Sequence, residues 1–302
     1  MWLIIIAWFV GRVASDRFVW SQWLLWIPTP VALAAAAIGV VISLRPAFES
    51  RRRTYRIALS LSALVAIAAY FGLMEHHFLR GHPESPTGLH LINLNASHDP
   101  DEDIATLIET IVKHHNDLTV LSSAHRVDWR RQLHDALGSK IRPNHVGTFV
   151  ILTSLKIVRL EPIAFTKDDI QISLLEIESR ASTKGRLRLY LVDLPSKPSR
   201  SRWAIAKKVR HLLDESDVPP PDLVLGDFNI TRSSAAMQYM FPALRHAYEN
   251  AGSGYGATFH RRFPLYHIDH VLLSDDWHAT SYRLVDPGIG RHMLQSTHIT
   301  PR

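Results

Sequence analysis

Two long stretches without a charged residue constrain this chain more than any other feature. Residues 23–44 form one stretch and residues 57–74 form the other. A helix of about 20 apolar residues crosses a hydrocarbon core of roughly 30 Å, so each stretch has the length of a transmembrane helix. Neither stretch has a polar face, which argues against two buried helices of a soluble protein. We therefore predict a membrane region over residues 1–74, with spans at about 23–44 and 57–74.

The beginning of this region carries further signals. Pro28 and Pro30 fall in the first turns of the first span, where a missing backbone donor costs least. Three tryptophans cluster at the same end, as in an interfacial belt: Trp20, Trp23 and Trp26. Residues 1–10 are apolar but too short to span, and they lack the charged flank and cleavage site of a signal peptide. We predict a partial span there, either an interfacial segment or the remnant of a third helix.

The distribution of charge gives an expected orientation. Residues 1–74 hold seven Arg, one Asp and one Glu, so they carry +5 of the total +6. Five of these arginines lie in "RPAFESRRRTYR" between the two spans, and such loops stay on the cytoplasmic side. We therefore expect a multi-pass protein of the cytoplasmic membrane with everything after Met74 on the outer side. The nearly neutral remainder shows no basic stripe with interleaved aromatics, so we expect no nucleic-acid partner.

A globular domain follows a short linker. The polar segment 75–88 contains two prolines and two glycines and is typical of a linker. Strands are predicted at 89–95, 118–123 and 267–274 and in "TFVILTS", "IQISLLEIE", "RLRLYLVDL" and "DLVLG", and helices over about 99–115, 127–137 and "SRWAIAKKVRHLLDE". Asp99 and Pro100 form the start signal of the first helix. This irregular order of strands and helices predicts an α/β or α+β domain with packed sheets over residues 89–302.

Asp227 and Asn229 follow an apolar strand in "LVLGDFNITR". In extended geometry two such side chains leave the same face, and Gly226 lets the backbone turn there. An aspartate can take a proton or hold a metal, and an asparagine can donate to a phosphate oxygen. The alternative is that both residues only cap the turn.

A second carboxylate, Asp269, lies in the apolar stretch "YHIDHVLLS" between His267 and His270. A buried carboxylate needs a donor, and a histidine ring from another strand is a common and chemically useful one. Taken alone, this residue too is compatible with a structural role.

Together the two motifs resemble the endonuclease/exonuclease/phosphatase superfamily, the Mg-dependent phosphoesterases of the DNase I-like fold. The resemblance covers roughly residues 88–302 and is strongest at residues 222–274. It implies a four-layer β-sandwich flanked by helices, preceded here by N-terminal transmembrane helices as in membrane-anchored bacterial members. It also implies Mg²⁺ or Mn²⁺ as the cofactor.

The same resemblance implies roles for individual residues. Asp227 looks like the aspartate that activates the attacking water, and Asn229 like the amide that binds the scissile phosphate. Asn95 resembles the first-strand asparagine near the metal. Asp269 resembles the aspartate that orients a C-terminal histidine.

Two histidines are candidates for that C-terminal position. His292 is followed by a stretch long enough for a last strand, whereas His298 keeps the serine of the family's "SDH" motif but leaves only four residues behind it. We prefer His292 on this ground.

The chain departs from the family pattern where the metal should be held. Ser123 stands where the family motif "LQE" supplies a glutamate ligand of the metal. The aspartate before the C-terminal histidine is replaced by Arg291, or by Thr297 in the alternative alignment. Asp193 replaces the histidine of the family's "H-x-P" motif. Other carboxylates can substitute, because Mg²⁺ needs only one or two protein oxygens. The candidates are Asp193, Asp99, Asp101, Glu102 and Asp103. Alternatively Arg291 supplies the positive charge without a metal.

We therefore predict a membrane-anchored phosphoesterase-like hydrolase that cleaves a phosphate ester by metal-assisted attack of water. Its expected partners are the lipid bilayer and a phosphorylated substrate or headgroup. The alternative from another class is a catalytically impaired binding module that keeps the phosphoesterase fold.

Overall fold

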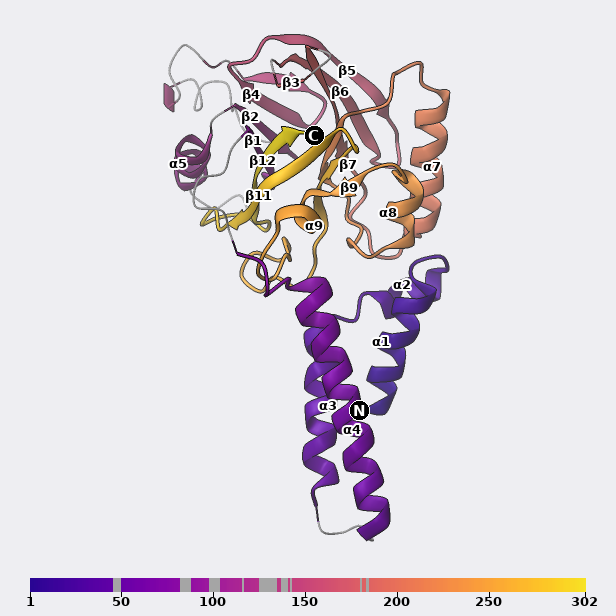
Figure 1. The fold of residues 1–302 in the computed structure, drawn as a ribbon. Helices are drawn as coiled ribbons and strands as arrows, with labels where there is room; N and C mark the ends of the chain where they lie inside the picture. The colour runs from indigo at the N-terminus through magenta and orange to yellow at the C-terminus, as the bar shows by residue number, and fades with distance from the viewer. Residues whose placement is uncertain are drawn as a thin grey trace.

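Two packed sheets stand on a group of N-terminal helices (Figure 1). The computed structural model describes residues 1–45, 50–81, 88–97, 104–115, 117–124, 135–136, 141, 143–179, 181–182 and 185–302. Most of the predicted helix over 127–137, the start signal at Asp99 and Pro100 and residues 82–87 of the linker lie outside the described residues.

Each sheet has six strands. The first has the order β11-β12-β1-β2-β4-β3 and the second the order β5-β6-β7-β8-β10-β9. The pairs β1–β2 and β7–β8 are parallel, and the other neighbouring strands are antiparallel. The strands are β1 (Leu89–Asn95), β2 (Leu118–Ser122), β3 (Asn144–Val146), β4 (Phe149–Thr153), β5 (Ile157–Phe165), β6 (Gln171–Glu178), β7 (Arg186–Asp193), β8 (Leu223–Asp227), β9 (Arg245–His246), β10 (Asp269–Leu273), β11 (Trp277–Val285) and β12 (Leu294–Pro301).

The main core lies between the two sheets, because alternate residues of each strand point inward. Leu189 and Leu191 of β7 and Leu223 and Leu225 of β8 pack there against Leu91 and other residues of the first sheet. Fully burying one such side chain contributes about 1.5–3 kcal/mol.

Helices cover the outer face of each sheet. Helix α5 (Ile104–His114) packs on the first sheet through Leu107 and Ile111, whereas α7 (Arg202–Glu215) and α8 (Ala235–Met240) pack on the second through Val209 and Met237. A fourth short helix, α9 (Ala247–Ala251), lies beside β10 and β11. The predicted four-layer arrangement, helices on both sides of two sheets, is confirmed.

The N-terminal helices differ from the prediction at one point. The elements are α1 (Trp2–Ala14), α2 (Val19–Leu25), α3 (Thr29–Ser43), α4 (Ser50–Tyr70) and the π-helical turn η1 (Phe71–Glu75). The continuous helix predicted over residues 23–44 is wrong, since α2 and α3 meet at an angle of 67°. Pro28 lacks the amide hydrogen that a helix needs and disfavours helical geometry at Ile27, so α3 begins at Thr29.

By length and composition, the helix Arg51–Glu75 is apolar enough to cross a membrane, with a mean hydropathy of 2.2. Among the described residues, the bent pair α2–α3 passes the same test only if both helices count as one span. Helix α3 packs on α4 along a seam of small buried residues: Ala32, Ala36, Gly39 and Ser43. Small residues let two helices approach closely, and their outward faces remain apolar, as at Val41 and Val65.

The first connection between the helices and the domain runs through Gln22 of α2. Its Nε2 donates to the carbonyl oxygens of Pro198 (2.9 Å) and Arg200 (3.1 Å), and its Oε1 accepts from the backbone N–H of Arg202 (2.7 Å). This amide side chain therefore fixes the loop that follows β7 against α2.

A second connection fixes the loops around β8 and β10. Asp16 accepts hydrogen bonds from the Ser234 hydroxyl and from the backbone N–H of Ala236 (3.1 Å). The Tyr266 hydroxyl donates to the carbonyl oxygen of Trp26 (3.3 Å). The edge of the second sheet at which β7 and β8 end and β10 begins therefore faces the N-terminal helices.

Candidate active site

Polar side chains converge where five strands begin or end. Asn95, Asp193 and Asp227 are the last residues of β1, β7 and β8, Asp269 is the first of β10, and His292 precedes β12. The strand register places Asp227 opposite both Asp193 and Asp269. The side chains of Asp193, Asp227 and Asp269 point to the same side of their strands as the core residues do, so these carboxylates lie at the border of the apolar core between the sheets.

Asp227 is 2% exposed and accepts two hydrogen bonds. Its Oδ2 accepts from Asn95 Nδ2 (2.7 Å), and its Oδ1 accepts from the backbone N–H of Asn229 (2.9 Å). One carboxylate thus contacts the first sheet and also caps the turn after β8. The turn cap considered for this residue is therefore present, and its role as a site carboxylate stays a prediction.

Asn229 does not share a face with Asp227, so the expectation from extended geometry is wrong. Strand β8 ends at Asp227, and Asn229 has a φ of 51°, in the left-handed region that asparagine tolerates better than most residues. Its Nδ2 donates to the carbonyl oxygen of Leu194 (2.9 Å). The amide group retains a second N–H.

Asp269 holds His292, as the motif comparison expects for the preferred candidate. His292 Nδ1 lies 2.9 Å and 3.1 Å from the two oxygens of Asp269, and its Nε2 lies 3.9 Å from Asp227 Oδ2. His298 lies further along β12 and stacks on His90 with ring centroids 4.2 Å apart. The neighbour His270 hydrogen-bonds through Nε2 to the carbonyl oxygen of Ile230, on the other face of the sheet.

Two supporting residues of Asp269 were not anticipated from the sequence. Gln295 Nε2 donates to the carbonyl oxygen of Asp269 (2.8 Å), and Thr258 Oγ1 accepts from its backbone N–H (3.2 Å). Gln295 also accepts from Asn93 Nδ2 (2.6 Å) through its Oε1. A buried amide side chain needs such partners, so a glutamine near the start of the last strand was the available signal for Gln295.

The two substitutions Ser123 and Asp193 contact each other. Ser123 Oγ donates to Asp193 Oδ2 (3.1 Å), and Thr148 Oγ1 does so at 3.3 Å. The carboxylate expected at the end of β2 is therefore absent there, and one is present at the end of β7 instead. Arg291 is exposed, and its carbonyl oxygen accepts from the backbone N–H of Arg261 (2.7 Å). The alternative carboxylates Asp99, Asp101, Glu102 and Asp103 lie outside the described residues.

Burial and mutual repulsion shift the acids of this site. Burial, followed by the Asp269 charge, raises the pKa of Asp227 to about 7. Burial also raises the pKa of Asp193 to about 6, against the hydrogen bonds from Ser123 and Thr148. Burial would lower the pKa of His292, but the Asp269 carboxylate, aided by Asp227 and Asp193, outweighs it and raises this pKa to about 9.

The donor set fits a divalent cation. Three carboxylates face one histidinium, so the site carries excess negative charge away from water, which a cation would relieve. Asp227, Asp269 and His292 each offer a ligand atom within 4.8 Å of the others, a grouping found among the described residues. Carboxylate and amide oxygens are the ligands that Mg²⁺ and Mn²⁺ prefer.

Gly226 makes the approach of β7 and β8 possible just before Asp227. Its φ is 142°, and a Cβ atom there would lie 1.9 Å from the carbonyl oxygen of Val192. We expect Gly226→Ala to destabilise the domain by about 2–4 kcal/mol, because backbone atoms must move apart. Chemical denaturation measures this change. Gly185, with a φ of 70° and no atom within 4 Å of its Cβ position, is the control. Its alanine variant tests the φ penalty alone, about 1–2 kcal/mol. Equal losses at both positions would contradict the proposed clash.

Comparisons with known proteins agree with this fold. A model of the Endonuclease/Exonuclease/phosphatase family matches residues 76–297. A search of curated proteins found no match. An endonuclease/exonuclease/phosphatase family protein from Bacteroides thetaiotaomicron is 16% identical with a TM-score of 0.53, covering 72% of this chain and 99% of that one. The mannosyl-6-phosphatase of the same organism is 15% identical with a TM-score of 0.50, covering 70% and 100%. Truncated TDP2 of Caenorhabditis elegans is 15% identical with a TM-score of 0.51, covering 71% and 97%. At these identities the structural likeness shows the fold.

Proposed function

The chain belongs to the endonuclease/exonuclease/phosphatase family, and on that premise we propose that it is a membrane-anchored phosphoesterase that hydrolyses a phosphate ester by water attack. The observation that carries this proposal is the buried arrangement of Asp227 beside the hydrogen-bonded pair Asp269–His292. The family is hydrolytic, and the solved relatives named above include a mannosyl-6-phosphatase.

Asp227 acts as the general base in this proposal. Its pKa of about 7 lets it accept a proton from water near neutral pH. The hydrogen bonds from Asn95 Nδ2 and the Asn229 backbone hold the carboxylate in one orientation. The second N–H of the Asn229 side chain is available for a phosphate oxygen.

His292 stabilises the charge that develops on the phosphate. Asp269 accepts a hydrogen bond from the Nδ1–H of His292, so the ring presents Nε2 toward Asp227 and the space beside it. With a pKa of about 9 the ring is protonated at neutral pH and offers a positive charge in a site shielded from water.

Because the protonated His292 cannot bind a metal and Asp269 is paired with it, oxygens of Asp227, Asp193 and Asn95 would hold the divalent cation, Mg²⁺ or Mn²⁺. When bound, the cation supplies positive charge next to the phosphate oxygens. The substitution of Arg291 for an aspartate is compatible with this assignment, since Asp193 provides a carboxylate from another strand.

Anchoring in the membrane is part of the proposal. Four of the five arginines between the predicted spans, Arg51, Arg52, Arg53 and Arg56, lie at the start of α4, which is at the far end of the helix pair from the domain (Figure 1). Retention of these arginines in the cytoplasm would place the domain on the outer side of the cytoplasmic membrane. The predicted catalytic edge would then face the membrane, because the loops after β7 and β8 contact α1 and α2.

Hydrolysis assays test the function directly. The full chain, purified in detergent, is incubated with p-nitrophenyl phosphate and with bis(p-nitrophenyl) phosphate, in Mg²⁺ or Mn²⁺ and after chelation with EDTA. We expect turnover of at least one ester that EDTA abolishes. Failure to hydrolyse either ester with either metal would reject the enzyme and favour the alternative, a binding module that retains the fold, for which Ser123 in place of a carboxylate is the structural argument.

The pH dependence of the rate should report Asp227 and His292. Activity should rise with pH as Asp227 loses its proton, near or below pH 7, and fall near pH 9 as His292 loses its own. Asp269 raises both pKa values, so Asp269→Asn should move both limbs toward lower pH, by about 1 unit or more at the basic limb. Rates measured from pH 5 to pH 10 test this. If the basic limb of the pH–rate profile lies at the same pH in Asp269→Asn as in the parent, this limb does not report the titration of His292.

A further inference from the structure

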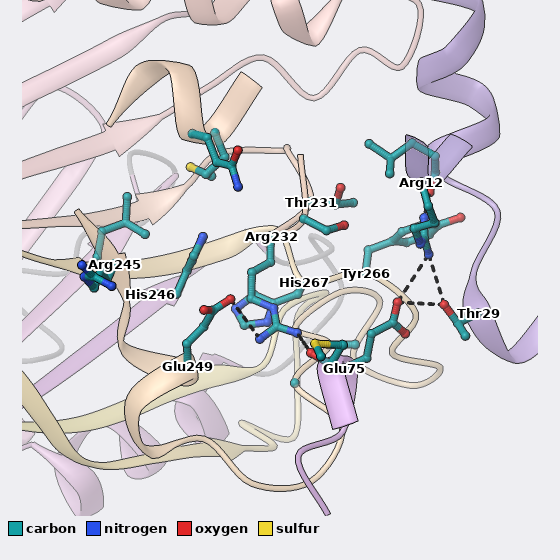
Figure 2. Close-up of a pocket in the computed structure, with 18 of the residues that line it drawn as sticks. Arg12, Thr29, Glu75, Thr231, Arg232, Arg245, His246, Glu249, Tyr266 and His267 are labelled. Carbon is teal, nitrogen blue, oxygen red and sulfur yellow. Dashed lines mark hydrogen bonds and ion pairs between the residues drawn. The ribbon is translucent and has the colours of Figure 1, made fainter. Parts of the chain in front are cut away.

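A cavity of about 920 Å³ lies between the domain and the ends of the N-terminal helices (Figure 2). One wall comes from α1, the connection between α2 and α3, and η1. The other comes from the loops that follow β8 and precede β10. Asp227, Asp269 and His292 are not part of the lining, so this space is distinct from the candidate active site.

Four residues of this lining each carry a buried polar side-chain atom without a hydrogen-bond partner among the described residues. These atoms are Arg12 Nε, Thr231 Oγ1, Arg232 Nη1 and His267 Nδ1. Native proteins pair more than about 90% of buried polar groups, because each unpaired group costs free energy. The two arginine nitrogens can only donate, and the threonine hydroxyl is able to donate. A group with several acceptor oxygens is therefore the complement of this cavity.

Two arginines enter the cavity from different parts of the chain, Arg12 from α1 and Arg232 from the domain (Figure 2). The Arg232 side chain is 11% exposed, and its Nη1 lies 3.7 Å from Glu249 Oε1, beyond hydrogen-bonding distance. Glu249 is 57% exposed, so water screens its charge. The buried charge of Arg232 is thus weakly compensated.

Arg12 is partly compensated by Glu75. Its Nη2 lies 3.4 Å from Glu75 Oε1, and the same oxygen accepts a shorter bond from Thr29 Oγ1 (2.7 Å). Each guanidinium thus has one carboxylate nearby, Glu75 for Arg12 and Glu249 for Arg232, and both pairs are long, at 3.4 Å and 3.7 Å. Planar guanidinium groups match the oxygens of a phosphate.

Arg232 is also held in place before any ligand binds. Its Nη2 donates to the carbonyl oxygen of Met74 (2.5 Å), and its guanidinium lies 4.4 Å from the ring centre of Tyr248. A fixed donor loses less conformational entropy on binding. These two contacts therefore fix the orientation of the Arg232 guanidinium.

We propose that this cavity is a second, non-catalytic binding site for a phosphate group, which Arg12, Thr231 and Arg232 hold. The group can belong to a lipid headgroup or to a soluble phosphate. The lining also contains apolar residues, Leu25, Ile27 and Met74, at the end of the predicted spans, which suits a phosphate attached to alkyl chains. The site is independent of the proposed hydrolysis.

Binding measurements on the full chain in detergent micelles test the site. The Asp227→Asn variant prevents turnover, and the ligands are dioctanoyl phosphatidylglycerol, inorganic phosphate and dioctanoylglycerol, which lacks a phosphate. We expect saturable calorimetric binding of at least one phosphate ligand. Tighter binding of the phospholipid, by about tenfold or more, identifies a lipid source, and equal binding identifies a soluble one. Equal binding of dioctanoylglycerol, or binding of neither phosphate ligand, would overturn the proposal and leave the cavity to water.

Two variants assign the binding to this cavity. Thr231→Val keeps the side-chain shape and removes a hydroxyl without a partner, so the thermal midpoint should stay unchanged while binding weakens about fivefold or more. Arg232→Gln should weaken binding at least about tenfold. The matched control is Arg245→Gln, because Arg245 is an exposed arginine of the same lining that pairs with Asp275 (3.0 Å). Its affinity should stay within about twofold of the parent. Binding that survives both Thr231→Val and Arg232→Gln, or that only Asp269→Asn abolishes, would overturn the assignment.

Discussion

Asp227→Asn is expected to lower the turnover number about 10³-fold, within a range of 10²–10⁴, because asparagine cannot take a proton from water. The substitution keeps the shape of a side chain that is 2% exposed and an oxygen that can accept from Asn95 Nδ2. The thermal midpoint should not fall much, since burial makes the charged form of Asp227 unfavourable and raises its pKa to about 7. Steady-state rates and thermal unfolding of the same preparations measure both effects.

A surface aspartate is the control for this variant. Asp168 is half exposed and pairs with Lys208, so Asp168→Asn should leave the rate and the midpoint nearly unchanged. A turnover number of Asp227→Asn within about threefold of the parent would remove Asp227 from the catalytic role. A lost rate together with a collapsed thermal midpoint would mean that the carboxylate is needed for the fold instead.

The sequence predicted strands where one periodicity dominated. The alternation in residues 89–95 became β1, and the apolar run ending at Gly226 became β8. The prediction of a continuous helix over 23–44 was wrong because a single proline hardly changes the hydropathy of the stretch. It does change the backbone at Ile27 and Pro28, where the helix breaks. Strand β11 (Trp277–Val285) was not predicted, since polar residues such as Ser281 and His278 obscure its alternation.

The candidate site was predictable only as far as motifs reach. Asp227, Asp269 and His292 were found by their context and do lie together. A turn after Gly226 was among the expectations, but the left-handed φ of Asn229 was not, because the sequence pattern does not show it. The contact between Ser123 and Asp193 joins residues 70 positions apart in the sequence. It forms because the sheet that contains β2 packs on the sheet that contains β7, which the sequence does not show.

That contact explains how the site could hold a cation without the expected glutamate. The end of β2 offers a hydroxyl and the end of β7 offers a carboxylate, 3.1 Å apart. The carboxylate that the family has after β2 is thus replaced by one at the end of β7, at the other end of this hydrogen bond. We expect Asp193→Ser to raise the Mg²⁺ concentration for half-maximal rate by about 10- to 100-fold, as loss of a group that binds or orients a metal does.

The reciprocal exchange tests this explanation. The double variant Ser123→Asp with Asp193→Ser returns the carboxylate to β2 and keeps one hydroxyl and one carboxylate in the pair. Ser123 has a φ of 52°, which aspartate tolerates better than glutamate does, so aspartate is the suitable replacement. We expect the double variant to recover Mg²⁺ dependence to within about fivefold of the parent, a coupling that a double-mutant cycle measures.

Ser123→Asp alone provides the third corner of the cycle. Two carboxylates about 3 Å apart repel each other and share a proton, so this variant should lose stability above neutral pH and regain it when Mg²⁺ is added. If the half-saturating Mg²⁺ concentration is the same in the parent, in Asp193→Ser and in the double variant, Asp193 does not hold the metal. The cation would then have to be held by Asp227 with Asn95 or Asp269, or with residues beyond those that the structure describes, and the substitution at Ser123 would be a loss without compensation.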